Sequence, residues 1–92
     1  ITVTGSSTLA PVLLEMAKAY EAKTPNVRVD VQTGGSSKGL ADARSGKADI
    51  GMVSRARRPD ETDLQWTLVA NDGLAIIVHK SNPLDALSAD QV

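Results

Sequence analysis

Cysteine and phenylalanine are both absent from this chain of 92 residues, which carries one tryptophan and one tyrosine. Without cysteine, the chain forms no disulfide and offers no thiolate ligand to a metal. With so few aromatic side chains, the core must be built from Val, Leu, Ile, Met and Ala, and little remains for stacking on bases or sugars. These absences disfavour thiolate metal sites and nucleic-acid binding.

Excess charge and long apolar runs are missing as well. The net charge is −1, so no overall positive field attracts nucleic acid or an acidic membrane surface. No stretch approaches the roughly 20 apolar residues that span a bilayer. The hydrophobic content of 41% and the charged content of 23% are those of an ordinary globular chain. Any anion site must therefore come from local geometry.

The patterns that are present repeat in the order strand, small-residue loop, helix. Apolar residues at helical spacing predict a helix over Leu9–Lys23, and a shorter helix is expected over Lys38–Ser45 with Gly46 as its stop. Alternating or continuous apolar runs predict strands at Ile1–Thr4, Val27–Gln32, Ala48–Val53, Trp66–Ala70 and Leu74–His79. The rhythm predicts an α/β fold, with a mostly parallel sheet, right-handed crossovers and flanking helices.

The chain reads as one domain at most, spanning residues 1–92. It opens with Ile1 rather than Met, which is typical of a processed or trimmed product. The ending at Ser88–Val92 has neither a clear cap nor a natural stop. We therefore expect part of a larger fold, cut before its next element.

Small-residue loops follow three of the predicted strands, at Gly5–Thr8, Gly34–Gly39 and Ser54–Arg55. Ligands of open parallel sheets bind beyond the carboxyl ends of the strands. The first two loops open directly into helices, whose free N–H groups and dipole attract anions. Glycine lets the backbone approach an anion closely, and hydroxyl groups add donors without bulk. These loops predict a site for a tetrahedral oxyanion.

Each loop also has a purely structural interpretation. Ser7 or Thr8 is a candidate N-cap of the first helix, and Ser36 or Ser37 of the second. Capping is compatible with anion binding, because a cap hydroxyl can turn toward a ligand. Arg55 directly follows a buried strand, whereas we expect its neighbours Arg57 and Arg58 on a solvated loop.

Signatures of enzymes are weak in this chain. The Gly-rich run around Lys38 lacks the Gly-Lys-Ser/Thr ending of a nucleotide P-loop. His79 is the only histidine and has no partner at metal-ligand or triad spacing. No serine lies in a Gly-x-Ser-x-Gly elbow. We expect no enzymatic activity and no cofactor.

Five motifs in order resemble the phosphate-binding proteins of ABC importers, at Thr4–Pro11, Gly34–Gly39, Ala48–Arg55, Asn71–Val78 and Ser81–Leu84. The resemblance implies a periplasmic-binding-protein-like (type II) fold of two lobes, with residues 1–92 as an incomplete first lobe that ends near the hinge. It also implies a partnership with ABC permease membrane subunits. The implied location is periplasmic or extracellular, with a lipid anchor as the variant for a Gram-positive source.

The resemblance further implies that phosphate lies dry between the lobes. It assigns a hydroxyl donor to Thr8, a backbone donor to Leu9, and both kinds of donor to Ser36. Some members carry Asp where this chain has Arg55, and that Asp accepts a hydrogen bond from protonated phosphate. The guanidinium of arginine only donates hydrogen bonds, so whether the site discriminates between phosphate and fully ionised anions such as sulfate stays open. The full expected ligand-binding set is Ser7, Thr8, Leu9, Ser36, Ser37, Ser54 and Arg55.

Three alternatives remain open from the sequence. The same domain could serve as a sensory or adhesion module. It could be a phosphate-handling hydrolase or nucleotide-binding domain. It could also be a structural fragment that forms a homodimer through an unfinished sheet edge.

Overall fold

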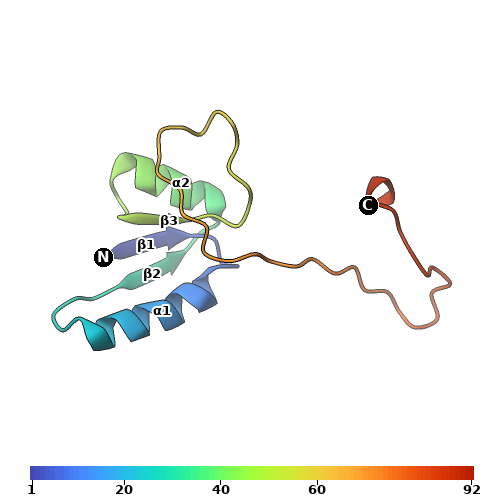
Figure 1. Cartoon of the computed structure of the whole chain (residues 1–92), viewed down its shortest axis with the longest axis horizontal. Coiled ribbons are helices and arrows are strands. Elements are labelled where there is room, and N and C mark those ends of the chain that lie inside the picture. Colours follow the sequence, from blue (N-terminus) through green and yellow to red (C-terminus); the bar gives the residue numbers. More distant parts are fainter.

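Three short parallel strands form the sheet of this computed structural model, which describes every residue from 1 to 92. The strands are β1 (Thr2–Gly5), β2 (Asp30–Thr33) and β3 (Ile50–Met52), and they lie in the order β2-β1-β3 (Figure 1). Helices α1 (Ala10–Lys23) and α2 (Ser36–Ser45) connect them. The expected α/β class with a parallel sheet and flanking helices is therefore confirmed.

The two helices cover opposite faces of the sheet (Figure 1). Successive side chains of a strand point to opposite faces of the sheet, so Val3 points toward one helix layer and Thr4 toward the other. Val3 and Met52 are 1% and 2% exposed and pack with Ala10, the first residue of α1. Thr4, which is 3% exposed, faces α2.

Helix α2 lies directly on the backbone of the sheet because Gly39 has no side chain. A Cβ at Gly39 would stand 2.7 Å from the Met52 carbonyl oxygen and 2.8 Å from the Thr4 carbonyl oxygen. Those distances are shorter than a carbon–oxygen contact tolerates. The close approach fixes the start of α2 at the carboxyl ends of β1 and β3.

Element boundaries agree with the sequence patterns to within a few residues. α1 begins at Ala10 with Pro11 in its first turn, and α2 begins at Ser36, earlier than expected. Gly46 ends α2 in the left-handed conformation, with φ of 73°, as predicted. The second strand starts at Asp30 rather than Val27, because its ladder with β1 begins where Thr2 pairs with Asp30.

The strands predicted at Trp66–Ala70 and Leu74–His79 are wrong. Both segments run extended without a partner strand, and Leu74 and Ile77 are 101% and 90% exposed. Apolar runs identify a segment that is able to pair, but a strand also needs backbone hydrogen bonds to a neighbouring edge, and neither segment forms them. Figure 1 shows the chain leaving the sheet here and ending in a short 3₁₀ turn, η1 (Ala89–Gln91).

No helix of the structure combines the length and the apolar character that crossing a bilayer requires.

Candidate anion-binding site

The carboxyl ends of the strands lie at one edge of the sheet, since all three strands are parallel. The Gly5 carbonyl accepts hydrogen bonds from the N–H groups of Gly34 at 2.9 Å and Gly35 at 3.0 Å. The Ser6 N–H donates to the Met52 carbonyl at 3.0 Å. The loop after β1 is thereby joined to the loop after β2 and to the end of β3.

Ser36, the first residue of α2, links this helix to the loop after β3. Its Oγ accepts a hydrogen bond from the Ser54 N–H at 3.1 Å and lies 3.3 Å from the Ser54 Oγ. An oxygen that accepts from a backbone N–H keeps its own hydrogen for donation. The structure therefore brings together the three loops that the sequence singled out.

Neither helix is capped by a side chain, which corrects the capping interpretation. The N-cap residues are Leu9 for α1 and Gly35 for α2, and neither makes a side-chain cap bond. Nearby, the Thr8 N–H donates at 3.2 Å to the hydroxyl of Ser6, which is 2% exposed. This local turn satisfies the Thr8 N–H and leaves the Thr8 hydroxyl without a protein partner.

Both helix starts retain donors with no acceptor in the protein. At α1 these are the N–H groups of Leu9 and Ala10, and at α2 those of Ser36 and Ser37. Free N–H groups at a helix start carry the positive end of the helix dipole. We use the name anion cradle for these four N–H groups together with the hydroxyls of Ser7, Thr8, Ser36 and Ser37.

Arg55 pairs with a carboxylate that the sequence analysis missed. Its guanidinium donates to both carboxylate oxygens of Glu61, at 2.9 and 2.5 Å, and to the Ala56 carbonyl at 2.9 Å. Glu61 is 6% exposed and also accepts the Arg58 N–H at 2.9 Å. The hydrogen bonds from Arg55, followed by that from Arg58, lower the pKa of Glu61 to about 2. No periodic pattern signals a contact across such a loop.

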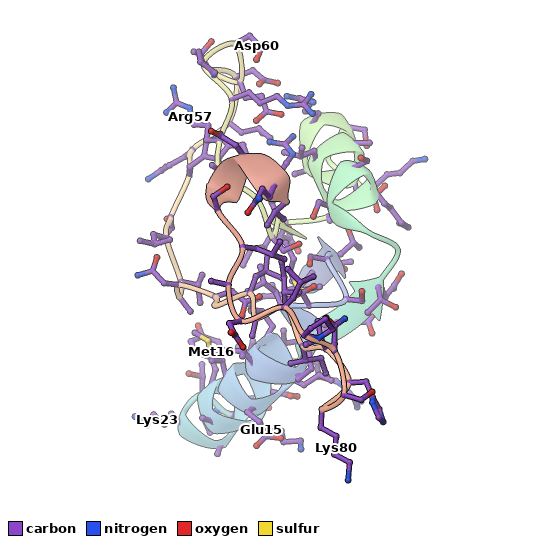
Figure 2. All side chains as sticks on the ribbon, turned by 90° about the vertical axis from the view of Figure 1, so that its right-hand side faces the viewer. Glu15, Met16, Lys23, Arg57, Asp60 and Lys80 are labelled. Atoms are coloured by element: carbon purple, nitrogen blue, oxygen red, sulfur yellow. The ribbon has the colours of Figure 1, made fainter.

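A second ion pair tethers the same loop to α2. Arg44 donates to the two carboxylate oxygens of Asp63 at 2.7 and 3.2 Å, and this contact lowers the pKa of Asp63. Arg57, in contrast, is exposed and takes part in no ion pair, as predicted for a solvated loop. Figure 2 shows Arg57 and Asp60 on this loop.

Helix α2 also holds a buried polar group on its sheet-facing side. The carboxylate of Asp42 accepts the Thr4 hydroxyl at 2.9 Å and the ammonium of Lys38. The hydrogen bond from Lys38, followed by that from Thr4, lowers the pKa of Asp42. The spacing of Lys38 and Asp42 is a recognisable helical pair, whereas the contact with Thr4 exists only in the fold.

Two hollows lie beside these loops. One of about 230 Å³ is bounded by Leu9, Arg55, Arg57 and Trp66, among others. The larger, of about 580 Å³, runs along the free edge of β3 between Leu13 of α1 and Leu40 of α2. Leu9 of the anion cradle lines both hollows, whereas Ser36 and Ser37 line neither.

The whole chain, residues 1–92, matches the PBP superfamily domain. The chain belongs to the PBP superfamily. This assignment agrees with the periplasmic-binding-protein resemblance in the loop motifs and with the parallel α/β sheet.

Several curated relatives of this PBP-superfamily chain carry the name phosphate-binding protein. It is 37% identical to phosphate-binding protein PstS 2 of Streptococcus agalactiae, over 100% of this chain and 32% of that protein. It is 35% identical to phosphate-binding protein PstS 2 of Streptococcus pneumoniae, over 96% of this chain and 31% of that protein. The phosphate-binding protein PstS of Pseudomonas aeruginosa is also 35% identical, over 96% of this chain and 30% of that protein.

The chain thus spans about a third of the length of these curated relatives, between 30% and 32% of each. No solved structure matches the chain significantly. The relatives support the predicted resemblance to phosphate-binding proteins, and the geometry of the loops remains the evidence for individual site residues.

Proposed function

We propose that this chain forms part of the first lobe of a solute-binding protein that captures phosphate or a similar tetrahedral oxyanion, without chemical conversion. The observation that carries the proposal is the anion cradle. Two helix starts without side-chain caps lie at one sheet edge, with free N–H groups. The hydroxyls of Ser7, Thr8 and Ser37 have no partner in the protein, and that of Ser36 accepts the Ser54 N–H. Such donors stabilise an anion through fixed hydrogen bonds and helix dipoles. The phosphate-binding relatives support phosphate as the first ligand to test.

The roles of the binding residues follow from their places in the cradle. Thr8 supplies a hydroxyl and Leu9 a backbone N–H from the start of α1. Ser36 supplies both kinds of donor from the start of α2, and its bond from the Ser54 N–H orients its hydroxyl. Ser7 and Ser37 are exposed hydroxyls that flank these groups.

Arg55 contributes at the rim of the cradle in this proposal. A guanidinium has five N–H donors, and three contacts engage Arg55, to Glu61 and to the Ala56 carbonyl. The remaining donors are available to an anion. Glu61 neutralises much of the positive charge, so Arg55 acts mainly as an oriented hydrogen-bond donor.

The proposed context is that of a substrate-binding component of an ABC importer. The chain would act outside the cytoplasmic membrane, in the periplasm or extracellularly, with ABC permease subunits as partners. The relatives are about three times as long, which supports residues 1–92 as part of a first lobe. Closure of a second lobe over the cradle would exclude water and complete the set of donors.

The decisive experiment is calorimetric titration of the full-length gene product with phosphate, sulfate, molybdate and arsenate. We expect phosphate binding, and the proposal fails if none of the four anions binds. Thr8→Val and Ser36→Ala should each weaken phosphate binding about tenfold or more, since hydrogen bonds to charged groups contribute about 1.5–3 kcal/mol. Thr24→Val and Ser45→Ala, at the far ends of α1 and α2, are the matched controls.

Two further measurements sharpen this experiment. Trp66 is the only tryptophan and lines a hollow together with Leu9, so its fluorescence should change when an anion reaches the start of α1. Arg55→Asp should weaken anion binding, because it removes donors and adds a negative charge beside Glu61. Unchanged affinity in this variant would remove Arg55 from the site.

A further inference from the structure

Lys38 lies in the first turn of α2, beside the anion cradle, yet its ammonium is directed away from the cradle. The ammonium forms an ion pair with Asp42, one turn further along the helix. On its way the side chain passes over Gly34, where an added Cβ would collide with the Lys38 Cδ. The side chain of Lys38 is 44% exposed, so it has room to change its rotamer if the ion pair with Asp42 is broken.

Asp42 is a rigid anchor for this ammonium. Its side chain is 12% exposed, and its carboxylate also accepts the hydroxyl of buried Thr4 at 2.9 Å. The Asp42 backbone carbonyl accepts the N–H groups of Lys47 at 2.9 Å and Ala48 at 3.2 Å. The contacts with Lys38 and Thr4 lower the pKa of the Asp42 carboxyl, which keeps it charged at neutral pH.

Side chains on a helix lean toward its N-terminus. A lysine at the third position of α2 therefore has the direction and the length to reach the free N–H groups of Ser36 and Ser37. An ammonium there would attract any anion, because it is a point charge with rotatable donors. Fixed N–H and hydroxyl groups, in contrast, select an anion by its shape.

We propose that Asp42 is a positioning residue that holds the Lys38 ammonium out of the anion cradle, and thereby makes anion selection depend on hydrogen-bond geometry instead of charge. This inference rests on the proposed function, because it concerns the selectivity of the same site. Its specific consequence is that breaking the pair exposes the cradle to an additional mobile cation.

The test compares Asp42→Asn, Lys38→Gln and the double variant by calorimetric titration of the full-length gene product with inorganic phosphate and with sulfate. Asp42→Asn should bind both anions about fivefold more tightly at low ionic strength, in line with the attraction of unit charges near water. The gain should disappear at high salt, because mobile ions screen an exposed charge. Lys38→Gln alone should bind phosphate as the parent protein does.

The double variant separates the lysine from a general charge effect. If the gain arises from the released ammonium, Lys38→Gln combined with Asp42→Asn returns to the parent affinity and salt dependence. A gain that persists in the double variant overturns the proposal, because it then reflects only the lost carboxylate. Weakened phosphate binding in Lys38→Gln alone also overturns it, since Lys38 would then be a ligand. Lys47→Gln is the control for removal of a nearby lysine.

A chemical measurement covers the case in which Asp42→Asn does not fold. Acylation of Lys38 in the parent protein, measured against Lys47, should proceed at the same rate with and without phosphate. Protection of Lys38 by phosphate would overturn the proposal.

If the parent protein binds no anion at all, the proposed function fails. The tether itself is then tested by Lys38 acylation, which should be slower in the parent protein than in folded Asp42→Asn.

Discussion

The guanidinium of Arg55 donates two hydrogen bonds, of 2.9 and 2.5 Å, to the carboxylate of Glu61. This contact closes the loop after β3, and the Arg58 N–H adds a third bond to the same carboxylate at 2.9 Å. Arg55, which we expect to contact the anion, thus also stabilises the loop in which it lies. In the proposed site, the orientation of Arg55 therefore depends on Glu61.

Removal of the Glu61 charge should loosen this loop. We expect Glu61→Gln to lower the midpoint of thermal unfolding by about 5 °C, the scale on which lost contacts shift small domains. The cause is that Arg55 and the Arg58 N–H lose a charged acceptor in a water-poor setting. Circular dichroism melts measure the shift. Asp60→Asn, an exposed carboxylate on the same loop with no ion pair, is the control and should melt like the parent. Equal midpoints for both variants would show that the contact between Arg55 and Glu61 does not stabilise the loop.

Acid should destabilise the protein through the same carboxylate. The pKa of Glu61 is lowered to about 2 by Arg55 and Arg58, from 4.5 as the ordinary value. A carboxyl whose pKa is lower in the folded state contributes stability that is fully present above the unfolded pKa and is lost as pH falls through the folded pKa. The loss should therefore occur between about pH 4.5 and about pH 2. Asp42 and Asp63 have lowered pKa values and add in the same direction.

Urea unfolding at a series of pH values measures this dependence. Glu61→Gln should show a shallower fall in stability over the acid range than the parent protein, because one titrating group is gone. A fall of the same steepness in both proteins would show that Glu61 does not carry the effect. Titration of the Glu61 carboxyl carbon by nuclear magnetic resonance gives the group's pKa directly.

The close approach of α2 to the sheet should not tolerate a methyl group. In Gly39→Ala the new Cβ meets the carbonyl oxygens of Met52 and Thr4 at 2.7 and 2.8 Å. Overpacking of this kind destabilises by about 1–3 kcal/mol. Because both oxygens belong to the backbone, we expect a cost in the upper part of this range, above the gain of about 1 kcal/mol from alanine's helix propensity. Urea titration measures the change. Gly73→Ala, where a Cβ meets nothing within 4 Å, is the matched control. Equal stability of the two variants would mean that α2 can shift without cost.

The extended segment after residue 70 should promote self-association of the 92-residue chain. Leu74, Ile76 and Ile77 are 101%, 59% and 90% exposed and have no strand partner. Unpaired extended backbone with apolar side chains is a template for pairing with another copy. Sedimentation velocity at increasing concentration should detect dimers, and Leu74→Asp with Ile77→Asp should reduce them about tenfold or more. Val92→Asp, an exposed apolar position outside the run, is the control. Equal association in all three proteins would exclude this segment as the interface.

Local patterns predicted much of the fold from sequence. The alternation of Val27, Val29 and Val31 with polar residues predicted a strand here, and each valine is half-buried while each intervening residue is exposed. Of the three, only Val31 lies within β2. Gly46 predicted the end of α2 because only a residue that tolerates positive φ suits that stop. The small-residue loops predicted where the anion cradle lies, because parallel strands bring their carboxyl ends to one edge.

Other features were decided only by the tertiary structure. Strand pairing in Trp66–Ala70 and Leu74–His79 failed because pairing needs a neighbouring edge, which a single segment's pattern does not contain. By residue type, Ser7 or Thr8 is a candidate cap of α1 and Ser36 or Ser37 of α2, but the backbone path puts Leu9 and Gly35 at those positions.

The sequence alone therefore determined the α/β class and the loops that carry the donors, because both depend on residues close together in the chain. The contacts that set the charge around those donors are tertiary: Arg55 with Glu61 across a loop, and Thr4 with Asp42 from strand to helix. Such contacts depend on where the backbone places side chains that are distant or irregularly spaced in sequence. Only the folded structure brings those side chains within hydrogen-bond distance.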